Sequence, residues 1–310
     1  MNEKHISVLL NESISFLNLN ERSVIVDATL GYGGHSSNIL KRINRGYLFA
    51  FDQDSEAIRH STDRLSSIGT NFTIIKSNFV YLKKELEKRN ITKVDGFLFD
   101  LGVSSPQLDE KDRGFSYHED ARLDMRMDKD NPLSAYDVVN TYSKEDLAYI
   151  FRVYGEDKFA NNIAKKIVEY REEKNIETTL ELVEIIKTAV PMKFRKDKHP
   201  AKTIFQAIRI EVNKELDVIE PALKDAMSML NVGGRICVIT FHSLEDRFVK
   251  RLFLEKTEVD RQLRGMPNIP EEYLPDFKLV TRKAILPSDD ELNNNPRAHS
   301  AKLRVIERIK

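Results

Sequence analysis

Residues 24–36, VIVDATLGYGGHS, decide how the first part of the chain folds. The run VIVD is apolar up to its final acid, which is typical of a parallel-sheet strand with both faces covered. The glycines that follow permit a tight turn and let a ligand approach the backbone without meeting a Cβ atom. A helical pattern then occupies residues 36–43. A strand, a glycine turn and a helix in this order predict an α/β fold with a ligand-binding turn.

The same alternation of apolar runs and amphipathic stretches continues to about residue 101. It predicts a mostly parallel sheet with helices on both faces. The expected strands are 24–27, 47–52, 72–75 and 95–101, and the expected helices are 36–43, 55–65 and 81–88.

The rhythm stops between about residues 107 and 202, where no strand is evident and residues 111–132 are polar and loop-like. Helical patterns with capping signals follow at 143–153, 158–172 and 178–190. We therefore expect an inserted all-helical subdomain at 108–203, between two parts of one core at 1–107 and 204–310.

The alternating pattern resumes in the last third of the chain. We expect one long helix over 204–230, a strand at 235–241 and a helix from residue 244. Two late strands, 278–285 and 302–309, are expected to form an antiparallel pair at one sheet edge.

Composition excludes several classes of protein. The 310 residues contain 49 Lys and Arg against 49 Asp and Glu, so a polybasic coat for nucleic acid is disfavoured. A single cysteine excludes a disulfide framework and fits a reducing compartment. The apolar run 6–10 is too short for a signal peptide, and no later run could span a membrane. A cytoplasmic protein with no membrane association is expected.

A nucleotide-like ligand is expected at the carboxyl ends of the strands, where open α/β sheets bind ligands. Asp52 ends the second expected strand and is placed to accept hydrogen bonds from two ribose hydroxyls. Asn78 and Phe79 follow the third, where Phe79 either packs on an adenine ring or belongs to the core. The dinucleotide pattern G-x-G-x-x-G/A is broken by Ser36, which weakens a dehydrogenase interpretation.

Several longer blocks resemble a known family. They lie in order along nearly the whole chain and match the bacterial small-subunit rRNA cytosine-N4 methyltransferases that use S-adenosylmethionine. The chain departs from the family pattern at Ala121-Arg122 and at His299. The matching blocks are 27–36 (DATLGYGGHS), 100–109 (DLGVSSPQLD), 123–128 (LDMRMD), 205–213 (FQAIRIEVN), 241–247 (FHSLEDR) and 295–304 (NPRAHSAKLR).

The resemblance implies a Rossmann-like class I methyltransferase core with a helical insertion. It also implies methylation of a cytidine in the decoding region of 16S rRNA, with S-adenosylhomocysteine as the cofactor product. The contacts to S-adenosylmethionine that it implies are Gly33, Gly34, His35, Asp52, Phe79, Asp100 and Gln107.

The chemistry requires groups that activate a poor nucleophile. The exocyclic amine of cytosine has its lone pair delocalised into the ring, and acceptors for its N–H groups would draw that lone pair toward the methyl donor. We expect Asp100, Ser104, Ser105 or backbone carbonyls of this turn to supply them.

Methylation at C5 would need a cysteine nucleophile, but Cys237 lies in the middle of an expected strand, where a buried core residue fits better. The seven histidines show no paired spacing for a metal.

RNA binding must come from local patches because the net charge is zero. The clearest patch is residues 192–202, with Lys193, Arg195, Lys196 and Lys198 as candidate contacts. His242 follows a strand end and is interpreted as a substrate contact or a helix cap, whereas 122–128 is an RNA contact or a loop tied by local ion pairs.

The expected partner is 16S rRNA within the small ribosomal subunit, with a homodimer as a further expectation. The alternatives are a non-catalytic ribosome-assembly factor that binds RNA and an NAD-type dehydrogenase.

Overall fold

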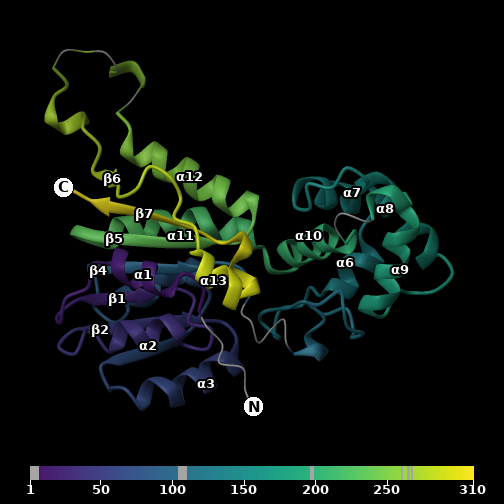
Figure 1. The fold of residues 1–310 in the computed structure, drawn as a ribbon, viewed down its shortest axis with the longest axis horizontal. Coiled ribbons are helices and arrows are strands. Elements are labelled where there is room, and N and C mark those ends of the chain that lie inside the picture. The colour runs from purple at the N-terminus through teal and green to yellow at the C-terminus, as the bar shows by residue number, and fades with distance from the viewer. Residues whose placement is uncertain (1–6, 104–109, 196–198, 260, 264–265, 267) are drawn as a thin grey trace. The chain divides into compact units, whose positions relative to one another are not determined.

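The computed structural model describes residues 7–103, 110–195, 199–259, 261–263, 266 and 268–310 (Figure 1). The chain divides into two compact units. Unit 1 comprises residues 1–102 and 216–310, and unit 2 comprises residues 103–215. Unit 2 is thus inserted into unit 1.

Unit 1 is built on a seven-stranded sheet in the order β3-β2-β1-β4-β5-β7-β6. Six of its strands lie where the apolar runs predict a strand, and the seventh, β6, keeps only the first residues of its predicted range. The strands are β1 (Val24–Asp27), β2 (Tyr47–Asp52), β3 (Phe72–Lys76), β4 (Val94–Asp100), β5 (Leu230–Thr240), β6 (Phe277–Leu279) and β7 (Lys302–Arg308).

The pairing confirms the predicted α/β class. Strands β3, β2, β1, β4 and β5 run parallel, whereas β7 is antiparallel to both β5 and β6. The expected antiparallel pair therefore lies at one edge of the sheet. Beyond β6, the predicted strand continues only as an isolated bridge between Ile285 and Leu303.

Helices connect the strands of unit 1, and most begin and end close to the predicted positions. The exceptions are α1 and α13, which are short and were not predicted. The helices are α1 (Leu10–Phe16), α2 (Gly34–Leu40), α3 (Ser55–Ser66), α4 (Leu82–Glu87), α11 (Glu215–Met229, whose first residue belongs to unit 2), α12 (Ser243–Thr257) and α13 (Asp289–Asn294).

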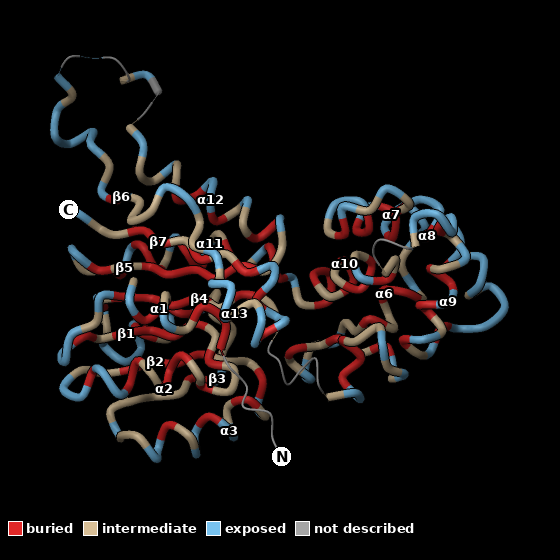
Figure 2. The backbone as a smooth tube through the Cα atoms, in the orientation of Figure 1, coloured by how far each residue is buried: buried red, intermediate tan, exposed pale blue. Residues whose placement is uncertain are grey.

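The core of unit 1 lies on the central strands. Figure 2 shows β1, β2, β4 and β5 mostly buried. Cys237 is fully buried in β5, and burial raises the pKa of its thiol well above the usual range. The thiol is therefore not a reachable nucleophile, as the sequence predicted.

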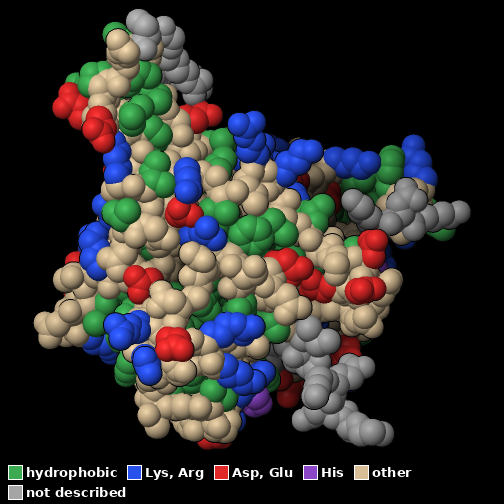
Figure 3. All heavy atoms as spheres, turned by 60° about the vertical axis from the view of Figure 1, so that its left-hand side comes forward, with side chains coloured by type: hydrophobic (Ala, Val, Ile, Leu, Met, Phe, Trp, Pro, Cys, Tyr) green, Lys and Arg blue, Asp and Glu red, His purple; other side chains and the backbone are tan. Residues whose placement is uncertain are grey.

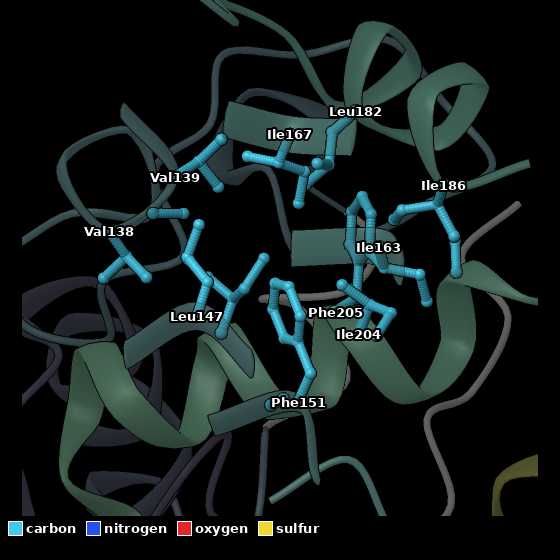
Figure 4. Packing of buried hydrophobic residues seen from close by; sticks show 14 of the residues in the cluster. Val138, Val139, Leu147, Phe151, Ile163, Ile167, Leu182, Ile186, Ile204 and Phe205 are labelled. Carbon is cyan, nitrogen blue, oxygen red and sulfur yellow. The ribbon is translucent and has the colours of Figure 1, made fainter. Parts of the chain in front are cut away.

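Unit 2 is helical and has its own core. In Figure 4, Leu147, Phe151, Ile163 and Phe205 point toward a common centre. Its helices are α6 (Ala135–Thr141), α7 (Lys144–Val153), α8 (Ala160–Arg171), α9 (Thr179–Ala189) and α10 (Ala201–Asn213).

The single long helix predicted over 204–230 is wrong. The structure has two helices, α10 and α11, because Lys214 between them adopts a left-handed backbone with φ 52°. No glycine or proline stands at that position to signal the break. Lys214 lies next to one of the boundaries between the units. Along the sequence these boundaries fall at 102/103 and 215/216, whereas 107/108 and 203/204 were expected.

In the part of the chain that the structure describes, no helix is long and apolar enough to cross a membrane. Figure 3 shows that Lys and Arg side chains share the visible face with Asp and Glu side chains. This mixture agrees with the formal charge of zero.

Candidate functional site

Three acidic residues end neighbouring parallel strands of unit 1. Asp27 ends β1, Asp52 ends β2 and Asp100 ends β4, and β1 pairs with both of the other strands. Carboxyl ends of parallel strands meet at one edge of a sheet, so these residues share the edge where α/β folds bind ligands.

The glycine turn after β1 fits a close approach to the backbone. Gly33 has φ +72°, a left-handed conformation that favours glycine. A Cβ atom added to Gly34 would lie 1.9 Å from the Ser7 Oγ, so position 34 accepts no side chain without movement. The hydroxyl of Ser61 donates to the Gly31 carbonyl at 2.6 Å and holds the turn against α3.

Asp52 supports the turn while keeping capacity for a ligand. Its two carboxylate oxygens accept one backbone N–H each, from Gly31 and from Asp54, both at 2.8 Å. An ionised carboxylate offers about four acceptor sites, which leaves two for ribose hydroxyls. Burial raises the pKa of Asp52 to about 6, against the lowering effect of these hydrogen bonds.

Asp27 is a part of the site that the sequence interpretation missed. Its carboxylate is fully buried, accepts from the Ser36 hydroxyl at 2.6 Å and accepts from the Thr29 N–H at 3.1 Å. It therefore joins the strand end to the first turn of α2 across the glycine turn. Burial raises the pKa of Asp27 to about 6. Two features of the sequence could have indicated this role. An acid ends the otherwise apolar run 24–27, and Ser36 occupies the position of the third glycine in the dinucleotide pattern.

Asp100 has the most distinctive surroundings of the three. Its backbone N–H donates to the Thr29 hydroxyl at 2.7 Å, and its Oδ2 lies 3.6 Å from Nδ1 of His35. Its Oδ1 is buried and has no hydrogen-bond partner in the described part of the structure, although the whole side chain is 26% exposed. Burial and the nearby carboxyls of Asp27 and Glu245 raise the pKa of Asp100 well above its usual value.

Phe79 lies beyond the end of β3, beside the same edge. Its ring meets Phe99 edge-on at 5.8 Å between centroids, so it is part of the packing and is also partly exposed. The Asn78 amide donates to Gln53 at 3.1 Å, and the Ser77 N–H donates to the Asp52 carbonyl at 2.9 Å. These bonds join the ends of β2 and β3.

His242 caps α12. Its Nδ1 accepts from the Glu245 N–H at 3.4 Å, while the Glu245 carboxylate accepts from the N–H groups of Phe241 and His242. The sequence allowed either a substrate contact or a helix cap for His242, and the structure shows the helix cap. Contact with substrate stays a prediction.

Ser104, Ser105, Gln107, Lys196 and Lys198 lie outside the described residues. Lys193 and Arg195 lie in unit 2, where Arg195 donates to the Val190 carbonyl at 2.7 Å.

Some of the blocks that resemble the family contact one another within each unit. In unit 2, the Asn213 side chain donates to the Met125 carbonyl and accepts from the Met127 N–H, both at 2.8 Å. In unit 1, Arg304 donates to both oxygens of Asp246, at 2.7 and 3.1 Å. The loop 122–128 also contains the local ion pair that the sequence suggested, between Asp124 and Arg126 at 2.8 Å.

The family profile described as the MraW methylase family matches residues 2–309. The chain belongs to this methylase family. This membership confirms the predicted methyltransferase activity and S-adenosylmethionine as its cofactor.

The chain is also similar to individual proteins. The ribosomal RNA small subunit methyltransferase H of Exiguobacterium sibiricum is 56% identical over 308 residues, with 99% of each chain covered. Among solved structures, an rRNA methylase from Streptococcus thermophilus is similar at 13% identity and a TM-score of 0.47, covering 99% of both chains. A SAM-dependent O-methyltransferase from Thermotoga maritima is similar at 10% identity and a TM-score of 0.43, covering 99% of this chain and 68% of its own.

Proposed function

We propose that this MraW-family methylase transfers a methyl group from S-adenosylmethionine to N4 of a cytidine in the decoding region of 16S rRNA. Family membership over residues 2–309 and the 56% identical methyltransferase H support the reaction class and the substrate. The observation that carries the assignment to residues is Asp100, whose buried Oδ1 lacks a partner in the described structure at the end of the central strand β4.

The residues at this edge fit the cofactor. Gly33 and Gly34 form the turn that contacts its methionine end, beside His35; the positive φ of Gly33 and the close approach of Ser7 to Gly34 are met only by glycine. Asp52 accepts the ribose hydroxyls and Phe79 contacts the adenine. Asp100 and Gln107 complete the set implied by the family pattern. When bound, S-adenosylmethionine supplies an electrophilic methyl group on a sulfonium.

The task of the protein is to orient the acceptor amine. Asp100 accepts a hydrogen bond from the N4 amine, with Ser104 and Ser105 as further acceptors. Each such bond draws the nitrogen lone pair out of the ring and stabilises the positive charge that develops on the amine. Positioning of the two reactants contributes up to about 7–11 kcal/mol in favourable cases. Burial and the carboxyls of Asp27 and Glu245 raise the pKa of Asp100, and a positively charged ligand held beside it would favour its ionised form.

The RNA contacts are proposed in unit 2, as a substrate-recognition subdomain. Lys193, Arg195, Lys196 and Lys198 bind phosphates, and His242 contacts the target nucleotide from unit 1. The target base must be unpaired or leave its stack, because its amine is otherwise engaged in pairing. We further propose the assembled small subunit as the form of the substrate, a cytoplasmic location and a homodimer.

The test is direct methylation. Purified protein is incubated with S-adenosylmethionine and either 16S rRNA or small subunits from a strain in which the gene is deleted, and the nucleosides are analysed by mass spectrometry. We expect N4-methylcytidine at one position. The Asp100→Asn variant should lose at least about 100-fold in kcat at saturating cofactor, as is typical when one stabilising group is removed.

The matched control is Glu87→Gln, which removes an exposed carboxylate on α4 and should retain wild-type kcat. Full turnover by both Asp100→Asn and the Ser104→Ala, Ser105→Ala double variant would show that the amine acceptors are wrongly assigned. Calorimetry with S-adenosylhomocysteine and with NAD separates the alternatives. A non-catalytic assembly factor would bind neither ligand, and a dehydrogenase would bind NAD.

A further inference from the structure

Lysines in unit 2 fall into two groups according to their ion pairs. Three described lysines, Lys158, Lys193 and Lys202, have no carboxylate within 4.0 Å in the described part of the chain. Most other described lysines of the unit do have a carboxylate partner, namely Lys111, Lys144, Lys165, Lys166, Lys174, Lys187 and Lys214.

The three uncompensated lysines belong to segments that meet in space. The hydroxyl of Thr203 donates to the Asp157 carboxylate at 2.7 Å, which brings the residue after Lys202 to the residue before Lys158. The ammonium of Lys158 lies 3.7 Å from the centroid of the Phe194 ring, and that of Lys193 lies 4.9 Å from it. Two of the three ammonium groups, those of Lys158 and Lys193, therefore lie over one aromatic side chain.

Phe194 is a large apolar side chain that is partly exposed and partly packed. It is 37% exposed, although it packs against Phe159 with 5.2 Å between ring centroids. Phe159 in turn packs against the core of unit 2. The ring of Phe194 therefore packs on Phe159, which in turn contacts the core of unit 2, and part of the ring stays exposed to solvent. We call Lys158, Phe159, Lys193, Phe194 and Lys202 the Phe194 platform.

We propose that the Phe194 platform binds an unpaired nucleotide of the RNA substrate, with a base stacked on Phe194 and neighbouring phosphates held by the lysines. This inference rests on the proposed function and adds a stacking site to it. A supported ring among unpaired cations is the combination with which proteins bind single-stranded RNA. Paired RNA does not fit, since its bases are already stacked on one another.

Lys158 does not block such a base. Its ammonium is at the end of a flexible four-carbon stem, and it can exchange its contact with the ring for a contact with a phosphate. The lysines therefore contribute to affinity in a salt-dependent way, whereas Phe194 contributes in a way that salt does not change.

The experiment measures binding of the full chain to a single-stranded RNA 12-mer that carries 2-aminopurine. Stacking quenches this base, so the titration reports both affinity and stacking. Phe194→Leu keeps the apolar contact with Phe159 but removes the aromatic face. It should weaken binding by roughly 5- to 150-fold and abolish the quenching. Phe194→Tyr keeps the ring and should bind as the wild type does.

Charge is tested separately from stacking. The Lys158→Gln, Lys193→Gln double variant should reduce the slope of log affinity against log salt by about 1.4, while Phe194→Leu should leave the slope unchanged. The matched control is Lys165→Gln with Lys174→Gln. It removes two lysines that pair with Glu169 and Glu181 and should leave the slope unchanged.

Wild-type affinity and quenching in Phe194→Leu would overturn the proposal, as would equal loss in Phe194→Tyr and Phe194→Leu. Equally tight, Phe194-dependent binding of polyglutamate would instead identify the platform as a site for an acidic protein.

Binding of S-adenosylhomocysteine separates this proposal from the proposed function. The Phe194→Leu variant should retain it, and its absence in the wild type would contradict the methylase assignment while leaving the RNA result intact.

Discussion

At the scale of single residues, the carboxylate of Asp52 combines two roles. It holds the glycine turn through the Gly31 N–H and the start of α3 through the Asp54 N–H, and it has acceptor capacity left for a ribose. Asp27 has only a structural role, because it is fully buried and accepts hydrogen bonds from the Ser36 hydroxyl and the Thr29 N–H. The two acids are therefore expected to respond differently to cofactor.

Asp52→Asn should weaken binding of S-adenosylhomocysteine by about 10- to 150-fold at pH 7.5, because hydrogen bonds to a charged acceptor are lost. The pKa of Asp52 is raised to about 6, and the ionised form is the one that accepts two hydroxyls. Wild-type affinity should therefore rise with pH up to about 6 and level off above it, by at most tenfold per pH unit for this group. Isothermal titration calorimetry from pH 5 to 8 measures both effects.

The control is Asp63→Asn, which changes an exposed carboxylate on α3 and should reproduce the wild-type affinity and pH profile. If Asp52→Asn showed the same rise toward pH 6 as the wild type, another group would be responsible for the pH dependence. Unchanged affinity in this variant would remove Asp52 from the cofactor site.

At the scale of elements, the end of α10 organises the loop that contains residues 123–128. The side chain of Asn213 bonds the Met125 carbonyl, the Met127 N–H and the Arg209 carbonyl, at 2.8 to 2.9 Å. Met125 has φ 58°, a left-handed backbone that is unfavourable for a side chain of this kind. Asn213 thus compensates for strain in a loop nearly 90 residues away.

Asn213→Ala should lower the free energy of unfolding of unit 2 by about 2–4 kcal/mol, since it leaves backbone groups of Met125 and Met127 without their partner. Hydrogen exchange of peptides covering 123–131 and 204–213, measured across a urea series, checks this value. Asn162→Ala on the exposed face of α8 is the control and should change stability by less than about 0.5 kcal/mol. If Asn213→Ala also changed the free energy of unfolding by less than about 0.5 kcal/mol, the loop would be stable without the hydrogen bonds of Asn213.

The elements also show what the sequence reveals and what it hides. Strands β1 and β2 were predicted to the residue because a buried parallel strand is a continuous apolar run. The break at Lys214 was not predicted because lysine favours helices, and the local sequence gives no sign of the contacts that hold Asn213. The same limit applies to the site. The acids at the strand ends are visible in the pattern, whereas the bond from Asp27 to Ser36 depends on how the turn folds.

At the scale of the whole molecule, a formal charge of zero has to be reconciled with a substrate that carries a negative charge on every phosphate. Most described lysines of unit 2 are neutralised locally by a carboxylate, so they contribute little to a long-range field. The exceptions Lys158, Lys193 and Lys202 belong to described segments that contact one another through Phe194 and through the bond between Thr203 and Asp157. RNA affinity should therefore depend on where a charge is removed and much less on the net charge of the chain.

Two quadruple variants with the same net charge test this dependence. Replacing Lys193, Arg195, Lys196 and Lys198 by Gln should reduce the salt slope for single-stranded RNA by about 2.8, because each phosphate contact contributes about 0.7. Replacing Lys144, Lys165, Lys166 and Lys174, which pair with glutamates, should leave the slope near the wild-type value. The measurement is filter binding between about 50 and 200 mM salt. Equal slopes for the two variants would mean that net charge governs binding, and an unchanged slope in the first would exclude residues 193–198 from the RNA interface.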